Sequence, residues 1–227
     1  MAERRIKPIL NLHDNYVKMN LINPYILGGL PGDGLIGHWK FDNNTNDELG
    51  LHNLVSANIS YEQDRKGFAN GAVRCTDNNS LLDVGSNWDV GTQLTLSYWI
   101  NFSASNAPML FYALADTDYH TLQYFNAGWV YTRSGATPFA FRTFSLNINR
   151  WYYLTFVRNG TTVNEYVDGV LILTGTNSIS ANSSKIKYFN KRVPNETELY
   201  FLNGRLDDVR IYNRVLTEPE ILQLYNE

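Results

Sequence analysis

The acidic side chains of this 227-residue chain are the first place to look for catalysis. Glycoside hydrolysis needs two carboxyl groups that face one sugar bond, about 5 Å apart in retaining enzymes. A strand presents carboxylates on one face when they alternate, as in the patterns Glu-x-Asp-x-Glu and Glu-x-Asp-x-x-Glu. Neither pattern occurs, and the acidic residues gather at expected turns and in the pair Asp207-Asp208. The sequence therefore predicts that the protein is not a glycosidase.

Other residue types that perform catalysis also lack a pattern. The four histidines, His13, His38, His52 and His120, do not have the spacing of metal ligands, and no Gly-x-Ser-x-Gly motif is present. The single cysteine, Cys75, lies in a strand-like stretch with no helix start beside it that would lower the pKa of its thiol. We therefore predict a non-enzymatic protein in which Cys75 is a small buried hydrophobic residue.

The composition excludes several classes of protein. A net charge of −3 and a pI near 5.8 argue against nucleic acid as a partner. No stretch of about 18 apolar residues occurs, so we expect no membrane insertion. A single cysteine excludes an internal disulfide, and residues 1–8 carry charge without the apolar segment of a signal peptide behind them. These features favour assembly in a reducing compartment.

The last third of the chain predicts antiparallel strands. Asn159-Gly160 and Asp168-Gly169 interrupt apolar runs, and such dipeptides favour type I′ hairpin turns, in which both central residues have positive φ. The runs 151–157, 165–172 and 204–212 therefore predict a meander of three antiparallel strands.

A helix is predicted at 217–225, directly after these strands. Thr217 and Glu220 have the spacing of a capping box, and Pro219 is tolerated in the first turn. Ile221, Leu224 and Tyr225 then form one apolar stripe that would face the body of the domain.

The middle of the chain also predicts strands. Apolar residues alternate with Thr95, Ser97, Trp99 and Asn101 along 94–101, and four more strand-like runs lie at 109–115, 120–126, 128–133 and 139–146. The expected fold is all-β, an antiparallel two-sheet sandwich with a short C-terminal helix and an extended N-terminal arm.

An ordered series of segments resembles a known family. Residues 34–42 read Gly-Leu-Ile-Gly-His-Trp-Lys-Phe-Asp, and residues 206–214 read Leu-Asp-Asp-Val-Arg-Ile-Tyr-Asn-Arg. Between them stand further matching segments at 47–54, 71–74, 81–84, 94–100, 151–157 and 166–169. From about Gly34 to Tyr225 the chain resembles the laminin-G-like jelly rolls of the concanavalin A-like lectin and glucanase fold. Glucanases of this fold carry the alternating carboxylates that this chain lacks.

The resemblance implies a structural calcium ion where the first and last strands meet. Ca²⁺ takes six to eight oxygen ligands, which segments rich in Asp and Asn provide. The candidate side chains are Asp42, Asn44, Asp47 and Asp207. The alternative is that Asp47 and Asp207 only accept hydrogen bonds from backbone N–H groups in loops.

The resemblance also implies carbohydrate binding, the commonest role of the family. A sugar ring stacks on a rigid aromatic side chain, with amides or an arginine nearby for its hydroxyl groups. The candidates are Tyr112, Tyr119, Tyr124, Trp129, Tyr131 and Arg133, of which the last three share one strand face. The alternative is that these aromatic rings fill the core between the two sheets.

Residues 1–33 form an N-terminal arm outside the sandwich, which occupies 34–227. Segment 21–27 is apolar and extended ahead of a linker rich in glycine at 28–34. The arm is too apolar for a solvated tail and too short for a core of its own. It either packs on its own domain or docks on another chain.

These features predict a structural or decoration protein of a virion, in particular of a tailed phage. The arm would anchor the protein, as part of an oligomer, to other capsid or tail proteins, and the sandwich would face outward to bind host-surface glycans. Two alternatives remain open: a secreted, extracellular bacterial carbohydrate-binding module, and an intracellular scaffold that makes protein contacts.

Overall fold

The structure is a computed structural model. It describes residues 32–77, 79–103, 110–113, 120–125, 128–132, 141–143, 147–176, 184–190 and 201–227. The chain divides between Asp33 and Gly34 into two units, Met1–Asp33 and Gly34–Glu227. Residues 1–31 of the predicted docking arm lie outside the described residues, so the role of the arm stays a prediction.

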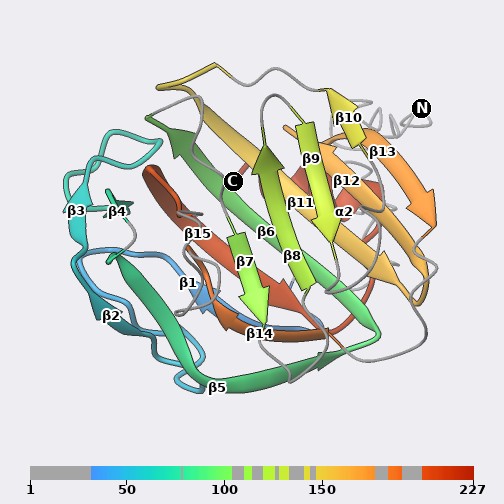
Figure 1. Cartoon of the computed structure of the whole chain (residues 1–227), viewed down its shortest axis with the longest axis horizontal. Coiled ribbons are helices and arrows are strands. Elements are labelled where there is room, and N and C mark those ends of the chain that lie inside the picture. The colour runs from blue at the N-terminus through green and yellow to red at the C-terminus, as the bar shows by residue number, and fades with distance from the viewer. Residues whose placement is uncertain are drawn as a thin grey trace, which may run out of the picture. The chain divides into compact units, whose positions relative to one another are not determined.

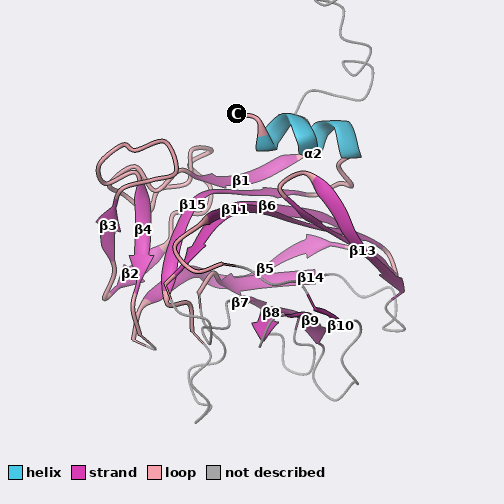
Figure 2. Ribbon diagram, turned by 90° about the horizontal axis from the view of Figure 1, so that it is seen from above, coloured by secondary structure: helices cyan, strands magenta, loops and turns pink. Residues whose placement is uncertain are grey.

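The second unit is a sandwich of two antiparallel sheets, which confirms the predicted fold class (Figures 1 and 2). Within the described residues, the first sheet runs in the spatial order β13 (Val170–Thr176), β12 (Thr162–Val167), β11 (Trp151–Asn159), β6 (Gln93–Phe102), β15 (Gly204–Tyr212), β4 (Ala72–Cys75) and β3 (Ser60–Glu62), with β1 (Leu35–Trp39) beside β15. The second sheet runs in the order β10 (Phe141–Thr143), β9 (Gly128–Thr132), β8 (His120–Phe125), β7 (Leu110–Ala113), β14 (Ser184–Tyr188), β5 (Leu81–Gly91) and β2 (Val55–Ala57).

The core between the sheets follows from the alternation seen in the sequence. On β6, Leu94, Leu96, Tyr98 and Ile100 are buried in the same cluster as residues of the second sheet such as Leu82. The cluster also holds Trp39 and Cys75. Burial raises the pKa of the Cys75 thiol to about 12, so this side chain is the small buried hydrophobic residue that was predicted.

The C-terminal helix covers the outer side of the first sheet. Helix α2 (Glu218–Tyr225) lies against the layer of β6, β11 and β15 in Figure 2. Its Ile221 and Leu224 are fully buried in a second apolar cluster with Tyr153 of β11 and Tyr212 of β15. The sheet is therefore buried on both faces at its centre.

The predicted capping box of α2 is present. The Glu220 backbone N–H donates to the Thr217 hydroxyl, and the Glu220 carboxylate accepts from the Thr217 backbone N–H at 2.7 Å. Arg214 adds an ion pair to Glu220, with 2.7 Å between Nη2 and Oε1. No helix among the described residues is both long enough and apolar enough to cross a lipid bilayer.

The two predicted hairpin turns differ from each other. Asp168 (φ 51°) and Gly169 (φ 78°) are the central residues between the paired Val167 and Val170, as expected for a type I′ turn. In the other turn Asn159 pairs with Thr162, so the central residues are Gly160 (φ 59°) and Thr161. A positive φ at the first central residue alone is the pattern of a type II′ turn, and the prediction of Asn159-Gly160 as its centre was wrong.

The strand meander also differs from its prediction in one respect. Its three strands are β11, β12 and β13, because the Asp168-Gly169 turn divides the run 165–172 into two strands. The run Gly204–Tyr212 forms β15 on the other side of β6, between it and β1. This position brings the last strand of the chain next to the first.

Candidate functional site

A groove of about 710 Å³ opens beside the turn that joins β5 to β6. Its lining comes from five places in the chain: the start of β1, the turn at Leu51 and His52, the segment 88–93, the β11–β12 turn, and Asn213 after β15. We call it the Trp88 groove. Its volume lies in the range of small-ligand sites, about 300–1,000 Å³.

An aromatic pair forms one wall of the Trp88 groove. The His52 and Trp88 rings stack with their centroids 3.9 Å apart and an interplanar angle of 28°. Trp39 is fully buried beneath them and meets Trp88 edge-on, at 6.3 Å between centroids. The Trp39 indole N–H also donates to the His52 carbonyl at 2.9 Å. The half-buried Trp88 ring is therefore held by contacts from both neighbours.

Gly37 of β1 makes this packing possible. A Cβ at Gly37 would overlap the Trp39 ring and come within 3.0 Å of the Trp88 ring. Any other residue here would have to displace one of the two indoles.

Amide side chains line the same groove. Gln93 Nε2 donates to Asn159 Oδ1 at 3.1 Å, where the last residue of β11 pairs with the first of β6. The Gly160 backbone N–H donates to the Thr92 carbonyl at 3.0 Å and ties the two turns together. An amide has two N–H donors and a carbonyl oxygen with two lone pairs, so the Gln93–Asn159 bond uses only part of their capacity. Asn213 is exposed at the same groove.

The chemistry of the Trp88 groove suits a neutral or weakly polar ligand that carries many hydroxyl groups. The aromatic pair contributes apolar ring surface to the lining, and the amides contribute hydrogen-bond donors and acceptors. Asp89 is the only carboxylate among the described lining residues, and it is exposed. Hydrolysis of a glycosidic bond by the usual route requires two carboxyl groups.

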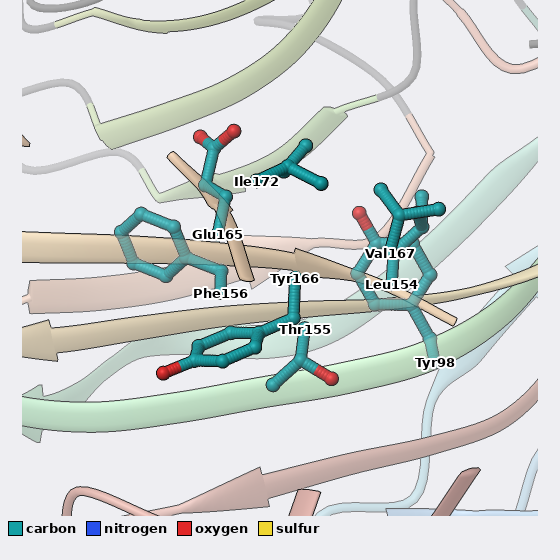
Figure 3. Close-up of a pocket in the computed structure, with 8 residues that line it drawn as sticks. All are labelled: Tyr98, Leu154, Thr155, Phe156, Glu165, Tyr166, Val167 and Ile172. Carbon is teal, nitrogen blue, oxygen red and sulfur yellow. The ribbon is translucent and has the colours of Figure 1, made fainter. Parts of the chain in front are cut away.

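A second, much smaller cavity of about 10 Å³ lies on the inner face of the first sheet (Figure 3). Figure 3 shows Glu165 and Tyr166 pointing to opposite sides of β12, so that Glu165 projects inward with Phe156 and Ile172 nearby. Burial raises the pKa of Glu165 to about 7, and its Oε2 atom has no hydrogen-bond partner among the described residues. The cavity has room for about one water molecule and none for a sugar.

Four of the six predicted sugar-binding residues lie on described strands, and none of these four is among the described lining residues of the Trp88 groove. Tyr112 belongs to β7, Tyr124 to β8, and Trp129 and Tyr131 to β9, where Tyr124 pairs with Trp129 in the backbone register. Tyr119 and Arg133 lie outside the described residues. The structure describes no side chain of these six residues, so their role in binding stays a prediction.

The predicted metal ligand Asp47 is fully engaged by backbone donors. Its Oδ1 accepts from the N–H groups of His38 (2.9 Å) and Leu49 (3.1 Å), and its Oδ2 accepts from those of Leu51 (3.1 Å) and His52 (3.0 Å). A carboxylate has about four lone-pair sites, and all four are used. Asp47 is buried, and its bonds hold the turn that carries His52 into the Trp88 groove.

Two of the other three predicted ligands, Asn44 and Asp207, are also engaged by protein groups, so the four do not form a free ligand set for a calcium ion. Asp207 pairs with Arg65, at 2.5 Å between Oδ2 and Nη1. The side chain of Asn44 bonds to the backbone of its own turn, at Asp42 and Asn46. Asp42 and Asp207 line one pocket together with Arg65. Among the described residues, no group of three or more His, Cys, Asp or Glu side chains is placed to hold a metal ion.

Sequence reasoning did not identify Trp88, Gln93, Asn159 or Asn213 as site residues. They come from three segments that only the strand pairing brings together: the β5–β6 stretch with Trp88 and Gln93, the end of β11 with Asn159, and Asn213 after β15. The one local signal is the tryptophan at position 88, which stands in a polar stretch between Asn87 and Asp89.

Comparison with known proteins gives one family. The Laminin_G_3 model, described as the concanavalin A-like lectin/glucanases superfamily, matches residues 71–222. The matched residues include Trp88, Gln93, Asn159 and Asn213 of the Trp88 groove. A search of curated proteins finds no match.

Three solved structures illustrate the likeness of fold. Domain 4 of AbnA, a GH43 extracellular arabinanase from Geobacillus stearothermophilus, in complex with arabinotriose, is 19% identical over 84% of this chain and 98% of that chain, with a TM-score of 0.69. A Trypanosoma rangeli sialidase in complex with sialic acid is 17% identical over 86% of this chain and 33% of that chain, with a TM-score of 0.65. The binding domain of botulinum neurotoxin serotype D/C is 19% identical over 86% of this chain and 52% of that chain, with a TM-score of 0.64.

Proposed function

Because the chain belongs to the concanavalin A-like lectin/glucanases superfamily, we propose that it binds a carbohydrate in the Trp88 groove without cleaving it. The observation that carries this proposal is that the stacked aromatic pair of His52 and Trp88 and the amide pair of Gln93 and Asn159 line the same groove. An apolar sugar face would lie against the aromatic pair while hydroxyl groups bond to the amides.

Rigidity of the groove supports the proposal, because a preformed site loses little entropy when the ligand binds. Trp88 is held by Trp39 and His52, and the turn that carries His52 is fixed by the four bonds to Asp47. The Gly160–Thr92 bond ties together the two turns beside Asn159 and Gln93.

The comparisons support binding and favour an extracellular carbohydrate-binding module over a virion component. A domain of the same fold, from an extracellular arabinanase, holds arabinotriose. The sialidase and the neurotoxin binding domain resemble this chain over only a third and about half of their own lengths. None of these relatives supports the virion setting, and an arm at 1–33 that docks on other virion proteins stays a prediction.

The test is binding of arabino-oligosaccharides and a panel of neutral glycans, measured by calorimetry on the full chain and on W88A. We expect W88A to lose at least about tenfold in affinity, because stacking surface and the support of His52 are both removed. The matched control is W151A. Trp151 is also half-buried, but it starts β11, whereas Asn159 ends it, roughly 26 Å away along the strand.

Two results decide the proposal. If W88A binds every ligand as tightly as the wild type does, the Trp88 groove is not the site. Loss of binding in N213A, an exposed change at the same groove, would support the assignment independently of any change in the packing around Trp88.

A further inference from the structure

Two adjacent carboxylates on the last strand meet one arginine from a distant loop. Arg65 Nη1 lies 2.5 Å from Asp207 Oδ2, and Arg65 Nη2 lies 3.2 Å from Asp208 Oδ2. All three side chains are about nine-tenths buried or more. One guanidinium therefore bridges two carboxylates that are largely withdrawn from water.

A bulge in β15 brings the two carboxylates to the same side. Asp208 has a φ of 52°, and the register of β15 against β6 shifts between Asp207 and Arg210. In a regular strand neighbouring side chains point to opposite faces, so without the bulge only one of the two would reach Arg65.

The loop before β4 holds Arg65 in place. The Asp64 carboxylate accepts from the backbone N–H groups of Lys66 and Phe68, both at 2.8 Å, which fixes the turn around Arg65. The guanidinium lies over the Trp99 ring, 4.8 Å from its centroid. Its position is therefore set from the loop on one side and from β6 on the other.

Asp208 has two further side-chain partners. His38 Nε2 lies 2.7 Å from its Oδ1, and Arg210 Nε lies 3.2 Å from the same atom. Arg210 in turn pairs with Glu227 at 2.7 Å. We call these residues, His38, Arg65, Asp207, Asp208 and Arg210, the β1–β15 junction.

We propose that Arg65 is the fixed cation of the β1–β15 junction and takes the place that a metal ion would have there. The resemblance to the family implies calcium at this position, but the predicted ligands do not fit one, and the carboxyl groups of Asp207 and Asp208 are paired with the side chains of Arg65, His38 and Arg210. The stability of the sandwich then depends on the Arg65 guanidinium and does not depend on a divalent cation.

The experiment compares melting curves of the full chain with and without an excess of chelator, and then with added Ca²⁺. We expect the wild-type melting temperature to be the same in all three conditions. A lower melting temperature in the presence of chelator would show that a bound ion stabilises the native state, and it would overturn the proposal.

The variants test the cation itself. R65M should melt about 5–15 °C below the wild type, because the buried Asp207 carboxylate loses its guanidinium partner and Asp208 loses one of its two arginine partners. K66M is the matched control: it removes the same charge from the next residue, and we expect a melting temperature within about 2 °C of the wild type. An R65M protein that melts like K66M would contradict the proposal.

A double substitution separates charge from packing. R65M/D207N should recover at least half of the loss of R65M, because a neutral side chain no longer needs the guanidinium, whereas a purely steric role of Arg65 predicts no recovery. Should R65M fail to fold, R65K answers the same question. R65K keeps the positive charge but cannot contact both carboxylates as the guanidinium does, so its melting temperature should be below that of the wild type. An equal melting temperature would refute the bridging role of Arg65.

Discussion

The His38 imidazole lies 2.7 Å from the Asp208 carboxylate, although 170 residues of chain separate the two. His38 belongs to β1 and Asp208 to β15, so this contact joins the first and last described strands of the sandwich. Both side chains are mostly buried.

The first prediction concerns acid stability at Asp208. Burial alone would raise the pKa of this carboxyl, but His38, Arg210 and Arg65 together lower it to about 2 from a usual value of 3.8. Its contribution is therefore present above about pH 4 and is lost as the pH falls toward 2, and it amounts to about 2 kcal/mol. D208N should reduce the free energy of unfolding at pH 7, with a smaller difference from the wild type at pH 2, in urea titrations at the two pH values. An equal difference at both would contradict the prediction.

The second prediction concerns the buried carboxyl of Glu165, for which the sign is opposite. Burial raises its pKa from 4.5 to about 7, so the native state binds more protons than the unfolded state between these values, and stability falls as the pH rises through this range. The loss corresponds to about 3 kcal/mol. E165Q keeps the shape without the charge, and it should be more stable than the wild type at pH 8 but not at pH 4.5. Parallel pH profiles of the two proteins would disprove this.

The third prediction concerns the start of α2. T217A removes the acceptor for the Glu220 backbone N–H and should cost about 1 kcal/mol. The melting temperature should then fall by about 2–4 °C. T217S keeps the hydroxyl and is the control, which should melt close to the wild type. Because α2 covers Tyr153 and Tyr212, near-ultraviolet circular dichroism also follows the change.

The fourth prediction concerns Gly37. G37A places a methyl group against Trp39 and Trp88, so one of the rings must move. We expect a loss of about 1–3 kcal/mol together with weaker carbohydrate binding. G67A is a control for the substitution of a glycine. Gly67 does not line the groove; it has a positive φ of 90°, and a Cβ there would meet only the Gln63 side chain, at 3.6 Å, so the variant should lose stability and keep its affinity.

The fifth prediction concerns the N-terminal arm. The sandwich from Gly34 onward has its own core, so deletion of residues 1–33 should leave a folded domain that still binds carbohydrate. If the arm docks on another chain, the truncated protein should lose its oligomeric state in analytical ultracentrifugation. Unfolding of the truncated protein would show instead that the arm belongs to the core.

Local signals in the sequence predicted the local structure well. The pair Thr217 and Glu220 was enough to locate α2, and Asp168-Gly169 was enough to place a type I′ turn. The alternation along 94–101 identified the inner face of β6. In each case the residues that decide the structure lie within a few positions of one another.

The site depends on pairing between distant segments, which no local pattern records. The centre of the β11–β12 turn is Gly160-Thr161 and not the predicted Asn159-Gly160. The reason is that Asn159 pairs with Gln93 of β6 and with Thr162 of β12. The Trp88 groove joins Ile36 to Asn213, and Arg65 meets Asp207 across 142 residues. The sequence indicated Asp207 as a candidate ligand, but it did not show that Arg65 is the partner of this carboxylate.

The lining of the Trp88 groove has a consequence for folding. Its residues run from Ile36 in the first described strand to Asn213 after the last, so the site is complete only when the two ends of the sandwich have come together. We therefore expect partly folded chains, in which β1 and β15 are not yet paired, not to bind carbohydrate. The amount of oligosaccharide bound would therefore measure the fraction of correctly folded molecules in a preparation. A column of immobilised ligand would separate these molecules from misfolded ones.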